Sequence, residues 1–257
     1  MQEYCCQRDQ YLISEEMLSS LGIKANSIYE NETTIARLAQ AMGETTGTGY
    51  AILPFCHTVE AKALGADILP ADAAAGPRPG RYVYETLSQI PLRSFVHTPE
   101  IQHLLAACQE LHRAGNKVAF QITGPISMLS CLMDLSSLFR TWRKQPDAVS
   151  AFLEQLVPLM LEYVEAICCA GADAISYADP AGTGTILGPR YTEAILQLFT
   201  LPFLQAASEY CADRTALMVC PLTMADLIKS SAFPSECTAA NRLLCRCVKA
   251  PSKPLLH

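Results

Sequence analysis

Hydrophobic residues are grouped along this chain in two ways, as short continuous runs and as stripes with helical spacing. The continuous runs lie at Tyr50 to Phe55, Lys117 to Thr123, Ala172 to Ala178 and Thr215 to Val219. Apolar runs of this length, bounded by glycine, proline or polar residues, predict buried strands. Helical segments separate the runs, and long crossovers of this kind connect parallel strands. The pattern therefore predicts an α/β fold with a parallel sheet.

Stripes of apolar residues three and four positions apart predict the helices between these strands. The predicted helices cover Glu32 to Thr45, Val59 to Leu64, Thr98 to about Gly115, Asp147 to Ala170, Tyr191 to about Ala212 and Ala225 to Ser231. Pro158 lies inside the fourth of them and should kink it. The segment from Met1 to Ile28 predicts a short helix and a loop. The segment from Asp67 to Tyr84 is rich in alanine, glycine and proline, and it predicts a long loop.

Polar and glycine residues follow each predicted strand. They are Cys56 and His57 after the first strand, Gly124 after the second, Asp179 after the third and Cys220 after the fourth. In α/β proteins the carboxyl ends of parallel strands hold the functional residues. We therefore expect Cys56, Asp179 and Cys220 to surround a common hollow. The alternative for the Asp179 loop is an ordinary surface turn, because aspartate, proline and glycine are also the common residues of turns.

Composition narrows the function classes. The chain has 257 residues, 50% of them hydrophobic, with a net charge of −6 and a pI near 5.4. The acidic balance and the lack of a basic run argue against a nucleic-acid or membrane partner. The longest apolar stretch, Leu156 to Ala178, is interrupted by charged residues and proline, so it is poor for a membrane span. Met1 is followed by polar residues, so no secretory signal is expected, and the 12 cysteines then predict reduced thiols in the cytoplasm.

Four sequence blocks resemble the uroporphyrinogen decarboxylase superfamily, most closely its corrinoid-dependent methyltransferase branch. They are ILPFCHTVEAKALGA from Ile52, ITGPISMLSCLMD from Ile122, GADAISYADPAGTGTILGP from Gly171 and the weaker LMVCPLT from Leu217. The blocks occur in the family's order, and the resemblance covers about residues 32–233. It implies a (β/α)8 TIM-barrel-like fold with its site at the carboxyl ends of the strands.

The predicted barrel is incomplete. A closed barrel of this kind has eight strands, whereas this sequence predicts four. The family's first strand and the strands after the Cys220 block are not found, and residues 234–257 form a divergent tail of a single domain over 1–257. Half a barrel would leave unpaired strand edges and an open apolar interior. The chain is therefore expected to be marginally stable or to form a homo-oligomer, which size-exclusion chromatography with light scattering would test.

One function that the resemblance implies is decarboxylation of uroporphyrinogen, a tetrapyrrole, in porphyrin biosynthesis. The decarboxylases carry a catalytic aspartate where this chain has Cys56, a tyrosine where it has Cys131 and a serine where it has Asp179. They also carry an N-terminal arginine-rich stretch that grips substrate carboxylates, and nothing before Tyr50 resembles it. Pyrrole decarboxylation needs a carboxylate to stabilise the protonated ring and cations to hold the acid groups. These differences argue against that function.

The methyltransferase branch matches the chain better. Its members move a methyl group between a corrinoid and a thiol such as coenzyme M, so the resemblance implies a corrinoid, a small thiol and a corrinoid protein as partners. Their zinc, held by a His-x-Cys pair and a further cysteine, deprotonates the thiol. Here Met218 stands where that histidine is expected, and Cys220 remains. Further ligands could come from the C-terminal cysteines or the first strand tip, which are Cys237, Cys245, Cys247, Glu60 and His57.

The resemblance assigns roles to the residues at the strand tips. They are Asp179 and Glu60 as catalytic residues, Cys56, His57, Gly124, Cys131 and Tyr177 as substrate-binding residues, and Cys220 as a zinc ligand. Structural alternatives stand beside these roles, since a strand-end cysteine is often simply buried, a histidine is often hydrogen-bonded within the fold, and Glu60, beside a lysine, could be a surface acid. A third function, a non-catalytic remnant that binds a tetrapyrrole or corrinoid, is favoured by Met218.

Overall fold

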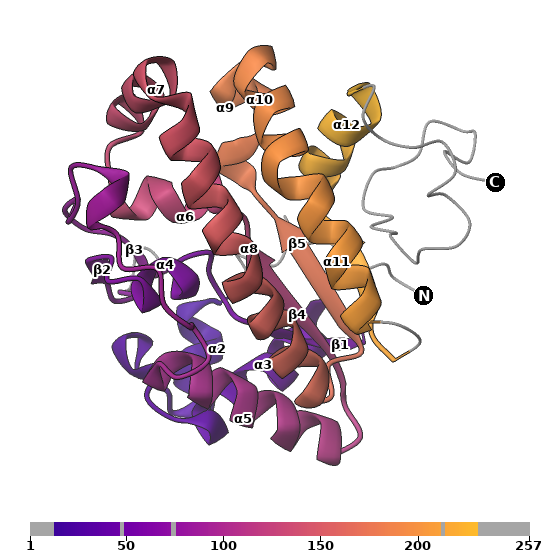
Figure 1. The fold of residues 1–257 in the computed structure, drawn as a ribbon. Coiled ribbons are helices and arrows are strands. Elements are labelled where there is room, and N and C mark those ends of the chain that lie inside the picture. Colours follow the sequence, from indigo (N-terminus) through magenta and orange to yellow (C-terminus); the bar gives the residue numbers. More distant parts are fainter. Residues whose placement is uncertain (1–12, 47–48, 73–75, 212–213, 231–257) are drawn as a thin grey trace.

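The computed structural model describes residues 13–46, 49–72, 76–211 and 214–230 (Figure 1). Its central element is a parallel sheet of four strands, β1 (Tyr50–Leu53), β4 (Lys117–Thr123), β5 (Ala174–Ala178) and β6 (Ala216–Val219). The spatial order β1-β4-β5-β6 repeats the chain order, so every crossover steps in the same direction. This is the winding of a β/α barrel, whereas a doubly wound sheet reverses direction. The barrel-type α/β fold expected from the sequence is confirmed, and the described residues contain four of its strands.

Four helices cover the outer face of this sheet, and each leads into the strand that follows it. They are α3 (Glu32–Thr46), α5 (Pro99–Arg113), α8 (Pro146–Cys169) and α11 (Leu201–Cys211). Neighbours in this series contact one another in the same order as the strands. The apolar stripes predicted for α5 and α8 are buried, so these helices screen the sheet from solvent and fix the position of its strands.

Shorter elements complete the described chain. The remaining α-helices are α2 (Glu15–Leu21), α4 (Val59–Ala63), α6 (Pro125–Leu132), α7 (Leu135–Lys144), α9 (Gly184–Leu187), α10 (Pro189–Ile195) and α12 (Pro221–Lys229), and short 3-10 helices lie at Ala25–Ser27, Leu87–Gln89 and Pro180–Gly182. Helices α4, α6, α9 and α12 follow the carboxyl ends of β1, β4, β5 and β6, so they frame one edge of the sheet. Two short antiparallel strands, β2 (Ile68–Leu69) and β3 (Arg78–Pro79), lie in the segment expected to be a loop. Within the described residues, no helix is long and apolar enough to cross a membrane.

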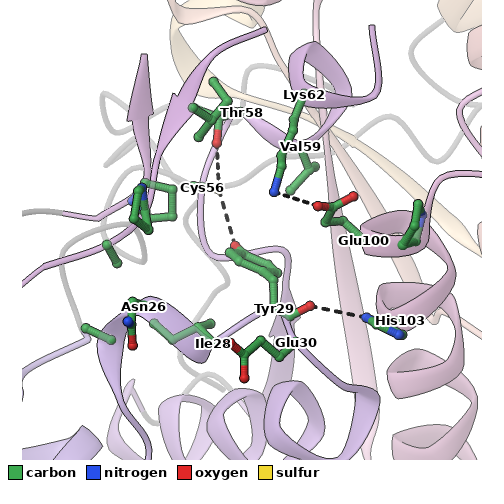
Figure 2. A pocket seen from close by; sticks show the side chains of 16 residues that line it. Asn26, Ile28, Tyr29, Glu30, Cys56, Thr58, Val59, Lys62, Glu100 and His103 are labelled. Carbon is green, nitrogen blue, oxygen red and sulfur yellow. Dashed lines mark hydrogen bonds and ion pairs between the residues drawn. The ribbon is translucent and has the colours of Figure 1, made fainter. Parts of the chain in front are cut away.

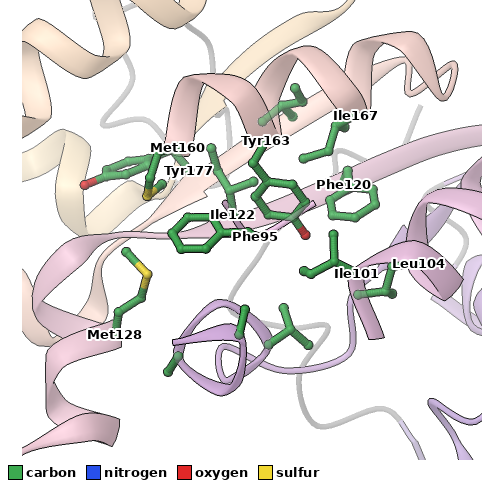
Figure 3. Close-up of a cluster of buried hydrophobic side chains, with 14 of the residues drawn as sticks. Phe95, Ile101, Leu104, Phe120, Ile122, Met128, Met160, Tyr163, Ile167 and Tyr177 are labelled. Carbon is green, nitrogen blue, oxygen red and sulfur yellow. The ribbon is translucent and has the colours of Figure 1, made fainter. Parts of the chain in front are cut away.

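The sheet is buried on both faces, as in the wall of a barrel. On the outer face, the ring of Phe120 packs edge-on against Tyr163 of α8 with centroids 5.8 Å apart, and Phe95 contacts the same tyrosine at 6.1 Å (Figure 3). The inner face carries a second cluster of smaller residues, which contains Ile52, Ala119, Ala174, Ala178 and Cys220. Successive side chains of a strand point to opposite faces, so this alternation assigns Cys220 to the inner face.

Helices α6 and α7 are not predicted from the sequence. Nearly every residue of α6 is buried, so this helix has no polar face and shows no amphipathic stripe. The helix predicted from Tyr191 to about Ala212 is divided, because a π-helical turn at Leu196–Thr200 separates α10 from α11. The predicted divergent tail, with Cys237, Cys245 and Cys247, lies outside the described residues.

Candidate functional site

The residues predicted at the strand tips lie along one edge of the sheet. Cys56, Gly124, Asp179 and Cys220 follow the carboxyl ends of β1, β4, β5 and β6. The tips are joined by backbone hydrogen bonds, such as the one that Gly124 N donates to the Ala178 carbonyl at 2.8 Å. Cys56, Asp179 and Cys220 therefore share this edge, with the end of β4 between the first two.

Glu60 is a fully buried carboxylate at the same edge. It lies on α4 with an exposed fraction of 0%, and its Oε1 accepts a hydrogen bond from the backbone N–H of Thr123 at 2.9 Å. Its Oε2 has no hydrogen-bond partner within the described part of the chain. Burial raises the pKa of this carboxyl to about 7, because a low-dielectric surrounding disfavours the charged form. Glu60 is therefore not a surface acid, and it can exchange a proton near neutral pH.

His57 is a neutral imidazole beside Glu60. Its Nδ1 lies 3.3 Å from Thr123 Oγ1, and burial lowers its pKa to about 4. A neutral imidazole offers one donor and one acceptor nitrogen. Because Thr123 also donates its N–H to Glu60, this threonine joins the two side chains into one polar group. Nothing in the sequence marks Thr123, which is simply the last residue of a strand pattern.

Cys56 carries a protonated thiol that is held by two hydroxyl groups. Its Sγ lies 3.2 Å from the Tyr29 hydroxyl and 3.1 Å from Thr58 Oγ1, and burial raises the pKa of the thiol. The Tyr29 hydroxyl accepts the N–H of Phe55 at 2.8 Å, which leaves its single proton for Cys56. A protonated thiol is a weak nucleophile, so Cys56 can line a site but is poorly suited to attack. Sequence analysis did not identify Tyr29, because the N-terminal segment next to it shows only weak hydrophobic periodicity.

A cavity of about 270 Å³ borders Cys56 (Figure 2). Val59 and Lys62 line it from α4, whereas Glu60 does not line it and instead bonds to β4. Lys62 Nζ lies 2.5 Å from the Oε1 of Glu100 on α5, so the ammonium charge at this wall is paired. The cavity is therefore a lateral space beside α4 and α5, and it is separate from the polar group around Glu60.

Asp179 uses both carboxylate oxygens to hold the first turn of α6. Its Oδ1 accepts the N–H of Ser127 at 2.8 Å and the hydroxyl of Ser127 at 2.7 Å, and its Oδ2 accepts the N–H of Ile126 at 3.2 Å. A carboxylate at a helix N-terminus satisfies amide groups that have no partner inside the helix. Burial nevertheless raises its pKa to about 6. Asp179 therefore ties β5 to the helix that follows β4.

The glycines around Asp179 are required by close packing. A Cβ atom on Gly124 would lie 2.4 Å from the Cβ of Asp179 and 2.6 Å from the Tyr177 hydroxyl. A Cβ atom on Gly182 would lie 2.5 Å from Asp179 Oδ2. At either position a Cβ atom would force neighbouring side-chain atoms to shift. The structure thus explains Gly124 by backbone packing against Asp179.

Tyr177 and Cys131 lie on the helix side of the site. The Tyr177 side chain is 0% exposed, packs against Phe203 of α11 and places its hydroxyl 3.5 Å from Thr200 Oγ1. Cys131 Sγ donates to the Ser127 carbonyl at 3.4 Å, and burial raises its pKa to about 11. The Tyr177 ring therefore belongs to the outer core, while its hydroxyl lies close to Gly124.

Within the described residues, the side chains around Cys220 do not form a suitable set of zinc ligands. Cys220 is 2% exposed and lies on the inner face, two positions after Met218. A zinc site needs three or four ligands from cysteine, histidine or carboxylate side chains, and no group of three such side chains is suitably arranged in the ranges that the structure covers. A thioether is also a poor replacement for imidazole.

A β/α sheet wound in one direction, with polar side chains at its carboxyl edge, defines a barrel-type α/β protein whose site lies at the strand tips. The chain belongs to the uroporphyrinogen decarboxylase family, whose model matches residues 4–221. The matched range contains all the strands and the whole polar edge described above, and it confirms the resemblance found in the sequence blocks.

The chain is similar to proteins that are named as methyltransferases. Two proteins named methylcobamide:CoM methyltransferase MtaA, from Methanosarcina barkeri strain Fusaro and Methanosarcina barkeri, are 23% and 25% identical over 188 and 192 residues. Each alignment covers 71% of this chain and 55% of the relative, so the chain spans about half the length of the curated relatives it matches. A solved methyltransferase from Methanosarcina mazei aligns with a TM-score of 0.69 at 22% identity, over 82% of this chain and 63% of that one. This match shows a shared fold.

Proposed function

We propose that this protein transfers a methyl group between a corrinoid and a small thiol such as coenzyme M. The relatives are named for this type of reaction, and the family match includes the strand-tip edge. The observation that carries the proposal is Glu60, a buried carboxyl with a pKa of about 7, one oxygen of which has no hydrogen-bond partner among the described residues. A thiol becomes an effective nucleophile only when it loses its proton, and a carboxylate of this pKa can accept that proton near neutral pH.

In the proposed reaction the thiol binds above Thr123, within reach of Glu60 Oε2. Glu60 Oε2 would take the S–H proton, which leaves the sulfur as a thiolate that can accept a methyl group. When bound, the corrinoid supplies or accepts the methyl group. His57 stays neutral and holds Thr123, so no cation competes with the thiol for the Glu60 carboxylate. Exclusion of water around Glu60 keeps the pKa of its carboxyl close to neutral pH, the pH at which the reaction is proposed to run.

The other predicted residues support this centre. Asp179 acts as a positioning residue, because its oxygens hold α6 rather than face a substrate. The candidates for substrate contact or support are Cys56, His57, Gly124, Cys131 and Tyr177, and Cys220 is the candidate for contact on the inner face. The proposed reaction uses a free small thiol, which a reducing compartment maintains. We therefore propose a cytoplasmic reaction, with a corrinoid protein as the partner that carries the methyl group.

Anaerobic incubation with methylcobalamin and coenzyme M tests the proposed function. The visible absorption of methylcobalamin should decay in proportion to protein concentration, and mass spectrometry should find the methylated thiol in equal amount. Parallel incubation with uroporphyrinogen should yield no coproporphyrinogen. Demethylation no faster than in a protein-free control, with both substrates present, would contradict the proposal.

The rate of methyl transfer should depend on the ionisation of Glu60. Because only the carboxylate form accepts a proton, kcat/KM should rise with pH and level off above about 7. The Glu60→Gln variant should lack this transition and follow only the ionisation of the thiol. A wild-type profile identical in shape to that of the variant would exclude Glu60 as the proton acceptor.

A second candidate function is corrinoid or tetrapyrrole binding without catalysis. Met218 favours it, because this side chain stands where the methyltransferase branch has a zinc-binding histidine. Equilibrium dialysis that finds tight cobalamin binding, together with no methyl transfer in the assay above, would support this function over the first.

A further inference from the structure

Two cysteines occupy equivalent positions in successive β/α units, at the end of the sheet opposite the candidate site. Cys168 lies in the last turn of α8, ahead of β5, and Cys211 is the last residue of α11, ahead of β6. Helices α8 and α11 pack against each other. Strands β5 and β6 are adjacent and parallel, with Ala174 opposite Ala216. The chain therefore brings the two helix ends together where it enters neighbouring strands.

Hydrogen bonds fix this meeting point. The Thr215 hydroxyl donates to the Ala172 carbonyl at 2.9 Å, and Ala216 N donates to the Asp173 carbonyl at 2.8 Å. These bonds join the segment after Cys211 to the segment after Cys168. The two thiols are close enough to influence each other's ionisation, and their residues are only 8% and 2% exposed.

The surroundings of Cys168 favour its thiolate. The neighbouring Cys211 side chain is the main cause that lowers the pKa of Cys168 to about 7. The Thr215 side chain and the Arg214 charge act in the same direction, and burial opposes them. The neighbouring Cys168 in turn raises the pKa of Cys211. By contrast, burial raises the pKa of Cys56, Cys108 and Cys131. One member of the pair is thus suited to attack and the other to resolve.

We propose that Cys168 and Cys211 form a redox-active dithiol that low-molecular-weight disulfides oxidise to an intramolecular disulfide. The Cys168 thiolate attacks one sulfur of the small disulfide, forms a mixed disulfide and releases one thiolate. The Cys211 sulfur, after losing its proton to solvent, attacks Cys168 and releases the second thiolate. Two protein thiols are oxidised and one small disulfide is reduced to two thiols. The new bond ties α8 to α11 and leaves the carboxyl edge of the sheet untouched.

Oxidised glutathione is a suitable probe for this dithiol. After incubation of the full chain, alkylation and peptide mapping by mass spectrometry should find a Cys168–Cys211 crosslink. The thermal midpoint should rise by about 5–10 °C, since the crosslink closes a long loop in the unfolded chain, and dithiothreitol should reverse the rise. The Cys169→Ser variant is the matched control, because Cys169 is the exposed neighbour, and it should behave as wild type.

Three results would overturn the proposal. They are glutathione retained on Cys168 without a crosslink, a crosslink from Cys168 to Cys108 or Cys169, and no reaction of either thiol under conditions that modify the exposed Cys169. Cys168→Ser and Cys211→Ser should each lose the shift in thermal midpoint. Peptide mapping of the wild-type chain decides the question even if one of these variants folds poorly.

Discussion

Replacing Glu60 by glutamine should lower kcat/KM for methyl transfer by about 10²–10⁴-fold, the range expected on removal of a general base. Glutamine keeps the volume of the side chain and can still accept the Thr123 N–H, but it cannot take the thiol proton. The matched control is Glu110→Gln, since Glu110 is an exposed acid on α5, and it should leave the rate unchanged. A Glu60→Gln variant that keeps wild-type kcat/KM would remove this residue from the mechanism.

The same substitution should stabilise the fold at neutral and alkaline pH. The folded pKa of Glu60, about 7, lies above its ordinary value of 4.5. A raised pKa gives stability that is complete below the unfolded pKa and is lost as pH rises through about 7. Glutamine carries no charge to bury, so above pH 7 the variant should exceed wild type by up to about 3 kcal/mol. Urea unfolding at several pH values measures this, and loss of activity together with higher stability distinguishes a catalytic from a structural carboxylate.

Asp179→Ala should lower the free energy of unfolding by about 3–5 kcal/mol. Asp179 is only 3% exposed, and alanine would leave the N–H groups of Ile126 and Ser127 and the Ser127 hydroxyl without their carboxylate. Asp134→Ala is the control, because Asp134 also accepts a helix N-terminal amide, that of Ser136 on α7, but does so at the surface. Its loss should be much smaller, because water can replace a carboxylate at the surface. Equal losses of unfolding free energy in the two variants would contradict the conclusion that Asp179 stabilises α6 through buried hydrogen bonds.

The deficit of Asp179→Ala should also depend on pH. Burial raises the pKa of Asp179 to about 6 from its ordinary value of 3.8, so the residue contributes most stability at low pH and loses part of it as pH rises through about 6. Urea unfolding should therefore show a larger difference between wild type and variant near pH 5 than near pH 8. A difference that grows as pH rises would mean that the pKa of Asp179 is lowered in the folded protein.

The strands and the long helices could be predicted because their buried residues recur with a regular spacing along the sequence. The run Lys117 to Thr123 forms β4 with the predicted bounds, and α5 begins at Pro99, directly after the predicted start at Thr98. Helix α6 shows no such spacing, because nearly all its residues are buried. A helix without a polar face cannot be distinguished by pattern from any other apolar run. The order of the strands within the sheet could be expected only from the family resemblance, because the order of strands along the sequence is compatible with several arrangements in a sheet.

Sequence analysis placed the polar residues at the correct edge, but it could not say which atoms they bond. Asp179 looked like a ligand-facing residue because its glycine-rich loop resembles a binding loop, whereas its oxygens hold α6. Tyr177 lies on the helix side of β5. The sequence could not show this, because β5 is buried on both faces and its residues therefore do not alternate between apolar and polar. Thr123 is 63 residues from Glu60, and Tyr29 is 27 residues from Cys56, so no local sequence pattern reveals these contacts.

Infrared difference spectroscopy of wild type against Glu60→Gln measures most directly whether Glu60 can serve as the proton acceptor. The carboxylic acid stretch that is present in wild type and absent from the variant reports the protonation of this one side chain. We predict that its amplitude falls by half near pH 7 as Glu60 ionises. A carboxylate already ionised at pH 5, or an acid still protonated at pH 9, would contradict the account.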